Sequence, residues 1–535
     1  MTKPHSTHLI YWAITAAMAG FLFGFDTIVI SGAEQTIQNL WKLSGSVHGL
    51  AVSMALWGTV IGAIFGGRPT EKYGRKKTLM GVGVLYFVSA VGSGLAPDVF
   101  SFMIARFIGG LGVGASTVAA PMFISEISPS NSRGKLAGMF QFNIVLGILV
   151  AFVSNYFFGQ YMSESIAWRW MLGIEAIPAA IYTLMSFTLP ESPRWLITHA
   201  RQRDAGERIF RQINPELGDA EIEALVSEVE ATACDTVKTS PFWSARLRVP
   251  IMLAFLIAFF NQFSGINIIL YFAPRLLGLA GLENALAAAA ALGVTNLIFT
   301  FVGLWLIDKI GRRSLLYIGS VGYILSLGIC AVAFLTTPGF KVVSCAGDLV
   351  SSAKTVITIN EDTSFVTDAD KARALDNFAA ARRALIEASV VKGYQGAAIT
   401  IPDSATPVEV QTIAEQGKEM ASETLGIMSM VVLVCLVGFI AAHAVGQGVV
   451  IWVFIAEIFP NDHRAKGQAL GCSTHWVCAA LLTLFFPIAM AHVSAGVLFS
   501  FFCFMMVLQL IWVKVSVPET KGISLEEMQK KLGIE

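Results

Sequence analysis

Charged residues are scarce in this chain. Of its 535 residues only 14% are Asp, Glu, Lys or Arg, whereas a soluble chain carries about a quarter. A large soluble protein is therefore excluded, because its surface needs many more charges to cover its buried helices. Lys plus Arg and Asp plus Glu number 37 each. This balance argues against a basic surface, and hence against nucleic acid as a partner.

Several chemical signatures are also missing. The seven cysteines lie mostly inside apolar runs, so we expect no disulfide framework. No phosphate-binding loop of the Gly-x-x-x-x-Gly-Lys-Ser/Thr type occurs, which argues against ATP as the energy source. His, Cys and carboxylate residues show no spacing typical of a nucleophile–base pair or a metal cluster. We therefore expect no enzyme activity, no metal and no cofactor.

Long apolar runs are abundant, and about 20 apolar residues span a bilayer as a helix. The first run is too long for a signal-peptide core, so we expect it to be retained. The fold class predicted is an all-α, polytopic membrane protein with twelve transmembrane helices. The predicted spans are 8–31, 48–67, 76–96, 98–125, 134–159, 167–189, 249–279, 284–308, 313–337, 425–456, 465–491 and 494–517.

Basic residues gather in alternate loops, which predicts the orientation because cytoplasmic loops carry the excess of Lys and Arg. On this basis both termini and the central loop are expected in the cytoplasm. The chain has no Asn-x-Ser/Thr sequon and only short tails, which favours a bacterial inner membrane. The basic loop residues are Arg68, Lys72, Arg75, Lys76, Lys77, Arg133, Lys135, Lys309, Arg312, Arg313, Arg464 and Lys466.

An internal repeat divides the chain into two halves. Residues 126–135 recur at 457–466, and residues 71–76 recur at 308–313. The offset changes between the two pairs, which predicts an insertion at 338–424 that projects from the outer side. The insertion is expected to form a small cap or a mobile loop, with a substrate-gathering lid as an alternative. It is predicted to contain helices at Lys371–Ser389 and Val410–Glu423, and strand-like segments at Val356–Ile359 and Ala397–Ile401.

The predicted domain organisation follows from the spans and the repeat. Helical patterning is also expected in the central loop, at Asp204–Ile213 and Ala220–Ala231. The predicted units are an N-terminal six-helix bundle (1–189), a cytoplasmic helical linker (190–248), helices 7–9 of the C-terminal bundle (249–337), the extracytoplasmic insertion (338–424), helices 10–12 (425–517) and a cytoplasmic tail (518–535).

Six segments in register resemble the sugar porter family of the major facilitator superfamily, and in particular its bacterial sugar–proton symporters. The segments are 24–32, 66–76, 106–114, 190–196, 262–267 and 518–522. The resemblance implies two pseudo-symmetric six-helix bundles that move around a central site. It also implies a monosaccharide and a proton as transported partners, and we expect a monomer in the lipid bilayer.

Asp26 stands near the middle of the first span, where a carboxylate costs a few kcal/mol on insertion scales and is a functional candidate. Burial favours its neutral form and a nearby cation favours its charged form, so such a group can take up and release a proton. The resemblance implies that Arg106 is the cation. Facilitators of the family generally lack this Asp, so its presence favours symport. The alternative is a static ion pair that holds two helices together.

Sugar hydroxyls call for amide side chains that both donate and accept, together with an aromatic face. The seventh span offers Asn261, Gln262, Asn267 and Tyr271. On a continuous helix Gln262 and Asn267 differ by about 140°, so they converge only if the helix breaks at Ser264-Gly265. The family resemblance adds further sugar-contacting positions, namely Phe23, Gln141, Asn296, Gly448, Trp452, His475 and Trp476. For the amides, the alternative is an ordinary interhelical hydrogen bond.

Three of these positions depart from the family pattern. Asn261 stands where the family has Gln, and His475 stands where it has Asn or Gln. No proline follows Gly448, so the sequence does not fix how the tenth span bends. The shorter Asn261 is expected to alter the preference among sugars.

Charged motifs at the cytoplasmic ends of the helices are interpreted, through the resemblance, as a gate that closes in one state and separates in the other. The alternative is anchoring by positive charges on the inner side. The predicted gate residues are Glu71, Arg75, Glu126, Arg133, Glu191, Arg194, Asp308, Arg312, Glu457 and Arg464.

The function predicted is secondary active transport, importing a hexose, a pentose or inositol with a proton by alternating access. A passive uniporter is the alternative, and Asp26 argues against it. A transporter-like sugar sensor is a further alternative, for which a longer cytoplasmic tail is expected than the one ending at Glu535.

Overall fold

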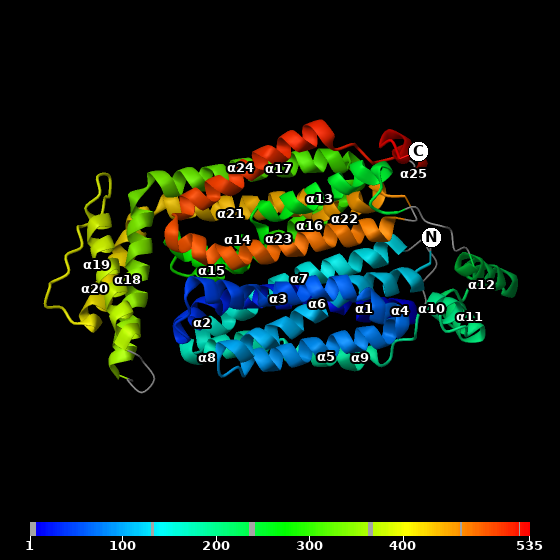
Figure 1. The fold of residues 1–535 in the computed structure, drawn as a ribbon, viewed down its shortest axis with the longest axis horizontal. Helices are drawn as coiled ribbons and strands as arrows, with labels where there is room; N and C mark the ends of the chain where they lie inside the picture. The colour runs from blue at the N-terminus through cyan, green and yellow to red at the C-terminus, as the bar shows by residue number, and fades with distance from the viewer. Residues whose placement is uncertain are drawn as a thin grey trace.

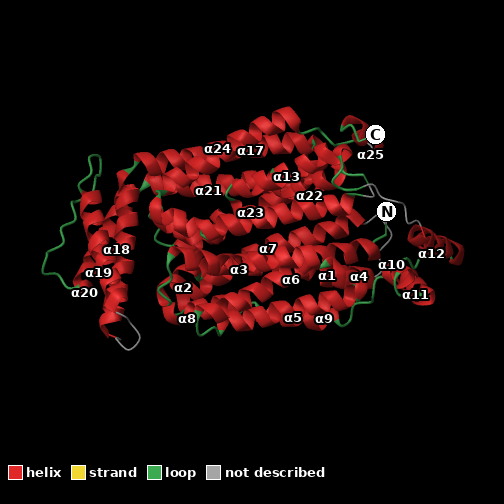
Figure 2. Ribbon diagram, in the orientation of Figure 1, coloured by secondary structure: helices red, strands yellow, loops and turns green. Residues whose placement is uncertain are grey.

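The computed structural model describes residues 7–129, 133–234, 241–361, 368–460, 463–523 and 525–534. Every regular element in these ranges is a helix, and none of the described residues forms a strand (Figure 2). The all-α prediction is therefore confirmed.

The first half of the chain forms one bundle of six membrane-crossing segments. Five of them are single helices, and the sixth is interrupted between α8 and α9. The elements are α1 (Thr7–Val29), η1 (Ile30–Gly32), α2 (Glu34–Leu40), α3 (Gly45–Phe65), α4 (Gly67–Lys72), α5 (Arg75–Gly94), α6 (Val99–Ile127), α7 (Arg133–Tyr161), α8 (Glu164–Gly173) and α9 (Ala176–Ser186).

The second half forms the other bundle, which lies above the first in Figure 1. Its first segment is broken into three helices and its fourth into two. The elements are α13 (Arg248–Phe263), α14 (Ile266–Tyr271), α15 (Ala273–Leu279), α16 (Ala285–Ile310), α17 (Arg312–Thr336), α21 (Ile427–Val445), α22 (Gln447–Ile458), α23 (Arg464–His492) and α24 (Ala495–Ser516).

We call the end of the molecule where α5 and α17 begin, at Arg75 and Arg312, the motif end. Both chain termini lie there, at the right of Figure 1. So do the linker elements α10 (Pro193–Thr198), α11 (Arg203–Ile213), α12 (Asp219–Cys234) and η2 (Ala245–Leu247), and the tail helix α25 (Leu525–Lys531). Helices α11 and α12 confirm the two helices predicted in the central loop.

We call the opposite end the cap end, because three helices of the insertion cover it. These are α18 (Pro338–Glu361), α19 (Asp368–Ser389) and α20 (Pro407–Leu425), and α18 runs across the direction of the bundles (Figure 1). Helices α19 and α20 confirm the two helices predicted in the insertion.

The two strand-like segments predicted in the insertion are wrong. Val356 and Ile359 lie in α18, where their spacing of three residues places both against Ala374 and Phe378 of α19. The same branched residues suit a strand or a helix, and packing decides in favour of the helix. The 397–401 segment is irregular, and its Ile399 amide donates to Ser389 Oγ at 3.0 Å.

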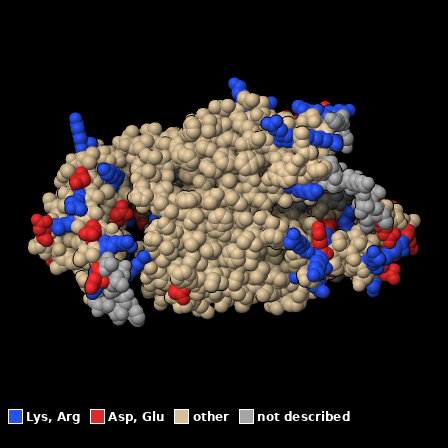
Figure 3. Space-filling model, viewed as in Figure 1, with Lys and Arg blue, Asp and Glu red and all other residues tan. Residues whose placement is uncertain are grey.

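Twelve helices of the described chain are long and apolar enough to cross a membrane, but they are not quite the predicted twelve. The set includes α18 and omits the interrupted sixth segment, α8 with α9. Because α18 lies across the cap end and α8 and α9 together follow the bundle, the crossing set is the other eleven helices plus α8–α9 (Figure 1). On the face seen in Figure 3, charged residues gather at the two ends and leave the middle nearly bare, as a hydrocarbon layer requires.

Close packing within a bundle depends on small residues, because apolar helices in lipid associate through tight contact. At Gly110 of α6, an added Cβ would lie 1.9 Å from the carbonyl oxygen of Ala55 in α3. Between the bundles, an added Cβ at Gly49 of α3 would lie 2.0 Å from the carbonyl oxygen of Leu484 in α23. The backbones of the two bundles therefore touch near the cap end.

We expect Gly110→Ala to destabilise the protein, because α3 and α6 must separate to admit the methyl group and overpacking costs about 1–3 kcal/mol. The melting temperature of the detergent-solubilised protein measures this. Gly81→Ala on α5 is the matched control, since nothing lies within 4 Å of its added Cβ. Equal melting temperatures for Gly110→Ala and the parent protein would contradict the prediction.

Candidate functional site

A buried ion pair joins α1 to α6 in the first bundle. Arg106 Nη1 lies 2.6 Å from Asp26 Oδ1, and Arg106 Nη2 donates to the Asp26 carbonyl oxygen at 2.8 Å. The two side chains are 1–2% exposed. The two residues predicted for proton coupling are therefore in direct contact at depth in the bundle.

Glu175 is a third ionisable residue at this place, and the sequence analysis did not single it out. It lies between α8 and α9, is 1% exposed, and interacts electrostatically with both Asp26 and Arg106. A signal was available, because an acidic residue inside the apolar run 167–189 meets the same criterion that identified Asp26. The interruption of the sixth segment at Glu175 was the part that the hydrophobic pattern did not show.

Helix breakage brings two predicted sugar-binding amides together in the second bundle. Gly265 separates α13 from α14 and has φ +87°, a left-handed conformation that favours glycine. Across this break Asn267 Nδ2 donates to Gln262 Oε1 at 3.0 Å. Gln262 Nε2 in turn donates to Asn261 Oδ1 at 3.2 Å. The three amides form one connected group.

Aromatic residues surround this amide group. Gln262 Nε2 lies 3.0 Å from Nε2 of the His475 ring, and the Trp452 ring centroid lies 5.4 Å from that of His475. Trp476 completes the cluster, because its ring meets Phe23 of the first bundle edge-on at 5.6 Å. The structure therefore joins predicted residues of both bundles in one polar and aromatic cluster.

Tyr271 lies on α14, the helix that also carries Asn267, and it interacts with the ion pair of the first bundle. It is 1% exposed, interacts with the charges of Arg106 and Asp26, and hydrogen-bonds to Thr27 of α1. Gly448 is the second residue of α22 and lies beside His443, whose carbonyl oxygen would lie 3.0 Å from an added Cβ. By contrast, Gln141 of α7 and Asn296 of α16 make no hydrogen bond to the cluster among the described residues.

Gln447 is a buried amide that the sequence analysis did not select. It is fully buried, and neither end of its amide has a hydrogen-bond partner within the described ranges. An amide left in this state costs about 1–3 kcal/mol, so it is a candidate for contact with a ligand or water. Its position between Gly446 and Gly448, inside an apolar run, was the available signal.

At the motif end the first bundle has a charge network around Arg75. Its guanidinium binds Glu126 twice, at 2.8 and 2.7 Å. Glu191 Oε1 accepts the backbone N–H groups of Arg75 and Lys76 at 2.8 and 3.1 Å. The side chain of Glu71 is exposed and pairs with no described residue, so Glu71 is not part of this network.

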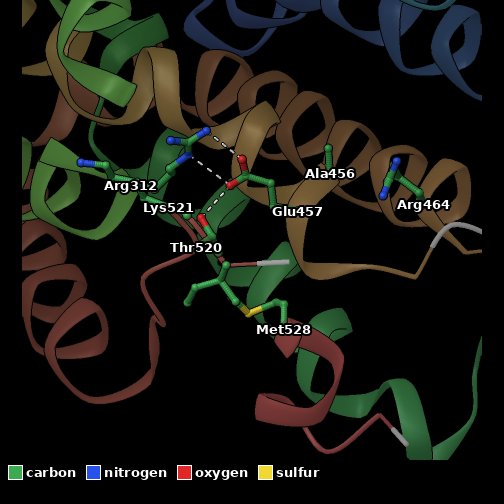
Figure 4. A pocket seen from close by; sticks show the side chains of 9 residues that line it. Arg312, Ala456, Glu457, Arg464, Thr520, Lys521 and Met528 are labelled. Atoms are coloured by element: carbon green, nitrogen blue, oxygen red, sulfur yellow. Dashed lines mark hydrogen bonds and ion pairs between the residues drawn. The ribbon is translucent and has the colours of Figure 1, made fainter. Parts of the chain in front are cut away.

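The second bundle repeats this network around Arg312. Its guanidinium binds Glu457 at 3.1 and 2.8 Å (Figure 4). Arg312 Nη1 also lies 3.1 Å from the exposed Asp308. Glu519 accepts the backbone N–H groups of Arg312 and Arg313. Burial acts to raise the pKa of Glu519, but these backbone donors and those of Thr520 and Lys521 overcome it and hold the pKa below its usual value.

The remaining gate residues are placed less tightly. Arg194 and Arg464 form no ion pair within the described part of the chain, and the side chain of Arg133 lies outside it. Arg464 and Glu457 both line a cavity of about 340 Å³ at the motif end, and Figure 4 shows them apart from each other. Glu457 instead binds Arg312 and Thr520.

Comparison with known families shows the family to which the chain belongs. Residues 12–353 and 411–532 match the family model described as "Sugar (and other) transporter". The chain belongs to this family of sugar transporters. Between the two matched ranges the model leaves 354–410 unmatched, and this stretch falls inside the insertion.

Curated relatives of this sugar transporter match over nearly its whole length. The D-xylose-proton symporter of Escherichia coli (strain K12) is 28% identical, covering 99% of this chain and 96% of the relative. The arabinose-proton symporter of Bacillus subtilis is 29% identical with the same coverage. The glucose transport protein of Synechocystis is 28% identical, covering 96% of this chain and 95% of the relative.

Solved structures show the same fold. The xylose transporter of E. coli in an inward open conformation is 27% identical and superposes with a TM-score of 0.72, covering 98% of this chain and 99% of that chain. The proton:xylose symporter bound to 6-bromo-6-deoxy-D-glucose gives 0.66 at 28% identity, covering 99% and 100%. The two-bundle architecture of the major facilitator superfamily is thereby confirmed.

We expect Gly265→Ala in this sugar transporter to weaken sugar binding. The new methyl group would be strained at φ +87° and would lie 2.9 Å from the ring of Phe502, so α13 and α14 must shift and separate Gln262 from Asn267. One lost hydrogen bond corresponds to about 1 kcal/mol, or about fivefold in affinity. A panel of labelled monosaccharides, bound to the detergent-solubilised protein, measures the change.

Gly278→Ala on α15 is the control for this prediction, because nothing lies within 4 Å of its added Cβ. It is expected to keep the parental affinity. Unchanged affinity in Gly265→Ala as well would remove the helix break from sugar binding.

Proposed function

We propose that the protein imports a monosaccharide together with a proton by alternating access. The observation that carries the proposal is the ion pair of Asp26 with Arg106, which is buried in the first bundle and interacts electrostatically with Tyr271, a residue of the same helix as Asn267. The names of two relatives, the D-xylose-proton and arabinose-proton symporters, support the same reaction.

Asp26 is proposed as the proton carrier. Its Oδ1 is held by Arg106, while its Oδ2 has no hydrogen-bond partner among the described residues and is the open position for a proton. Protonation of Asp26 replaces the ion pair with a neutral contact. Glu175 is then the carboxylate that can compensate the charge of Arg106. Because a buried charge must keep a partner, Glu175 is proposed to hold Arg106 while Asp26 is neutral.

The sugar is proposed to lie against Gln262, Asn267, His475 and Trp452. The amides supply donors and acceptors for hydroxyl groups, and the ring of Trp452 supplies an apolar face. Tyr271 shares α14 with Asn267 and interacts with the charges of the Asp26 ion pair, so it is the proposed path by which a bound sugar alters proton affinity. A pentose or a hexose fits this chemistry, and the names of the relatives include xylose, arabinose and glucose.

The motif end is proposed to face the cytoplasm of a bacterial cell, with the cap outside, because its loops carry most of the Lys and Arg. The Arg75 and Arg312 networks, which contain most of the predicted gate residues, lie at that end. In the structure each network lies within one bundle, so neither ties the bundles together. Their proposed role is to hold the helix ends rigid while the bundles rock.

We expect Asp26→Asn to abolish uphill sugar uptake and to retain sugar counterflow, because the amide cannot carry the proton but leaves the pocket intact. Proteoliposomes with an imposed pH gradient measure both. A membrane potential of 100 mV is worth about 2.3 kcal/mol per charge, or about fifty-fold accumulation, and the parent should approach this factor.

Asp376→Asn, on the exposed face of α19, is the matched control and should keep full accumulation. If Asp26→Asn accumulates sugar like the parent, Asp26 is not the coupling residue. If the parent itself shows no response to the pH gradient, the protein is a passive uniporter.

A further inference from the structure

A second buried ion pair lies near the cap end, and it joins the two bundles. Arg275 of α15 binds Glu34 of α2 twice, with Nε to Oε1 and Nη2 to Oε2 both at 2.9 Å. Glu34 is fully buried, and the side chain of Arg275 is 20% exposed. Glu34 belongs to the first bundle and Arg275 to the second.

His48 is a third member of this cluster. It lies on α3 in the same bundle as Glu34, is fully buried, and places Nε2 3.1 Å from Glu34 Oε2. Its Nδ1 has no hydrogen-bond partner among the described residues. The edge of its ring meets Phe272, the residue just before α15, with the centroids 6.4 Å apart. His48 therefore stands at the seam between the bundles.

The position of this pair matters more than its stabilising energy. A buried ion pair contributes little net stability, but removing one partner is strongly destabilising because a charge is left buried without compensation. Alternating access requires the bundles to part at the cap end, and this movement must separate Glu34 from Arg275. Opening that end therefore requires that Glu34 keep another partner.

We propose that Glu34 and Arg275 form the latch that keeps the cap end closed, and that His48 remains as the partner of Glu34 when the latch opens. The inference rests on the proposed alternating access and extends it by naming the positioning residues of the outer gate. His48 moves with Glu34 because both belong to the first bundle, whereas Arg275 leaves with the second.

The surrounding contacts agree with a latch at a seam. Gln38 of α2 also accepts from Arg275, and Arg275 interacts electrostatically with Asp348 of α18. Farther out, two contacts tie α18 to the first bundle. Ser351 Oγ donates to Asn39 Oδ1 at 3.1 Å, and Lys354 lies 3.9 Å from Glu164. The cap thus forms an outer layer over the buried pair.

The latch has a defined dependence on pH. Burial acts to raise the pKa of Glu34, but Arg275 and His48 overcome it and hold the pKa below its usual value, so Glu34 stays charged while the latch is closed. Once Arg275 leaves, protonated His48 compensates Glu34 and neutral His48 does not. Acid on the cap side therefore favours opening.

Hydrogen exchange of the full chain in proteoliposomes, read by mass spectrometry, tests the latch without relying on sugar or proton transport. In Glu34→Gln we expect exchange in α2 and α15 to rise by at least about tenfold at pH 7.5, because Arg275 loses its buried anion. Exchange in α4 and α5 at the motif end should not rise. Lys354→Gln is the control, since that contact is largely exposed and worth little.

The double variant Glu34→Gln with Arg275→Gln is the control that distinguishes loss of the ion pair from a general loss of folding. Removing both charges should raise cap-end exchange less than the two single changes combined, which defines a coupling between the residues. Equal increases at both ends of the molecule, or fully additive effects, would overturn the latch.

His48→Gln tests the role of His48 as the remaining partner of Glu34. After correction for intrinsic exchange rates, we expect the parent to show more cap-end exchange at pH 5.5 than at pH 7.5, and His48→Gln to lose this difference. The same pH profile in both proteins would overturn the role of His48. If Asp26→Asn still accumulates sugar while these results hold, proton coupling through Asp26 fails and the latch remains.

Discussion

Few charges enter the apolar interior of this protein, and each one that does must keep a partner, because an isolated buried charge is too costly to maintain. Two buried ion pairs show the two uses of this constraint. Asp26 and Arg106 lie within one bundle, so their pairing can persist while the bundles move. Glu34 and Arg275 lie in different bundles, so their ion pair opposes the separation of the bundles and must break when they separate.

The motif end shows a third arrangement, in which charge stabilises helix ends. Glu191 and Glu519 occupy equivalent places, each accepting backbone N–H groups at the start of a helix. Arg75 and Arg312 likewise each bind a carboxylate from another helix of the same bundle twice. The repeat in the sequence thus becomes a repeat in geometry, and the family match covers both copies.

Much of the architecture was predictable from local chemistry. Apolar runs locate the helices, and the change in repeat offset locates the insertion, which the family model also leaves partly unmatched. The glycine at 265 marked the helix break that joins Gln262 to Asn267. Predictions failed where a pattern suits two structures, as with Val356 and Ile359, because only contact with α19 makes that segment a helix.

Apolar runs and the internal repeat by themselves determined that this chain crosses a membrane as two related sets of helices, since both can be read along the chain without knowing its contacts. Tertiary structure alone decided the partners. Arg75 pairs with Glu126 rather than Glu71, Glu175 joins Asp26, and Arg275 reaches Glu34 across 241 positions. The reason is physical, because an ion pair depends on distance in space and a sequence records only distance along the chain.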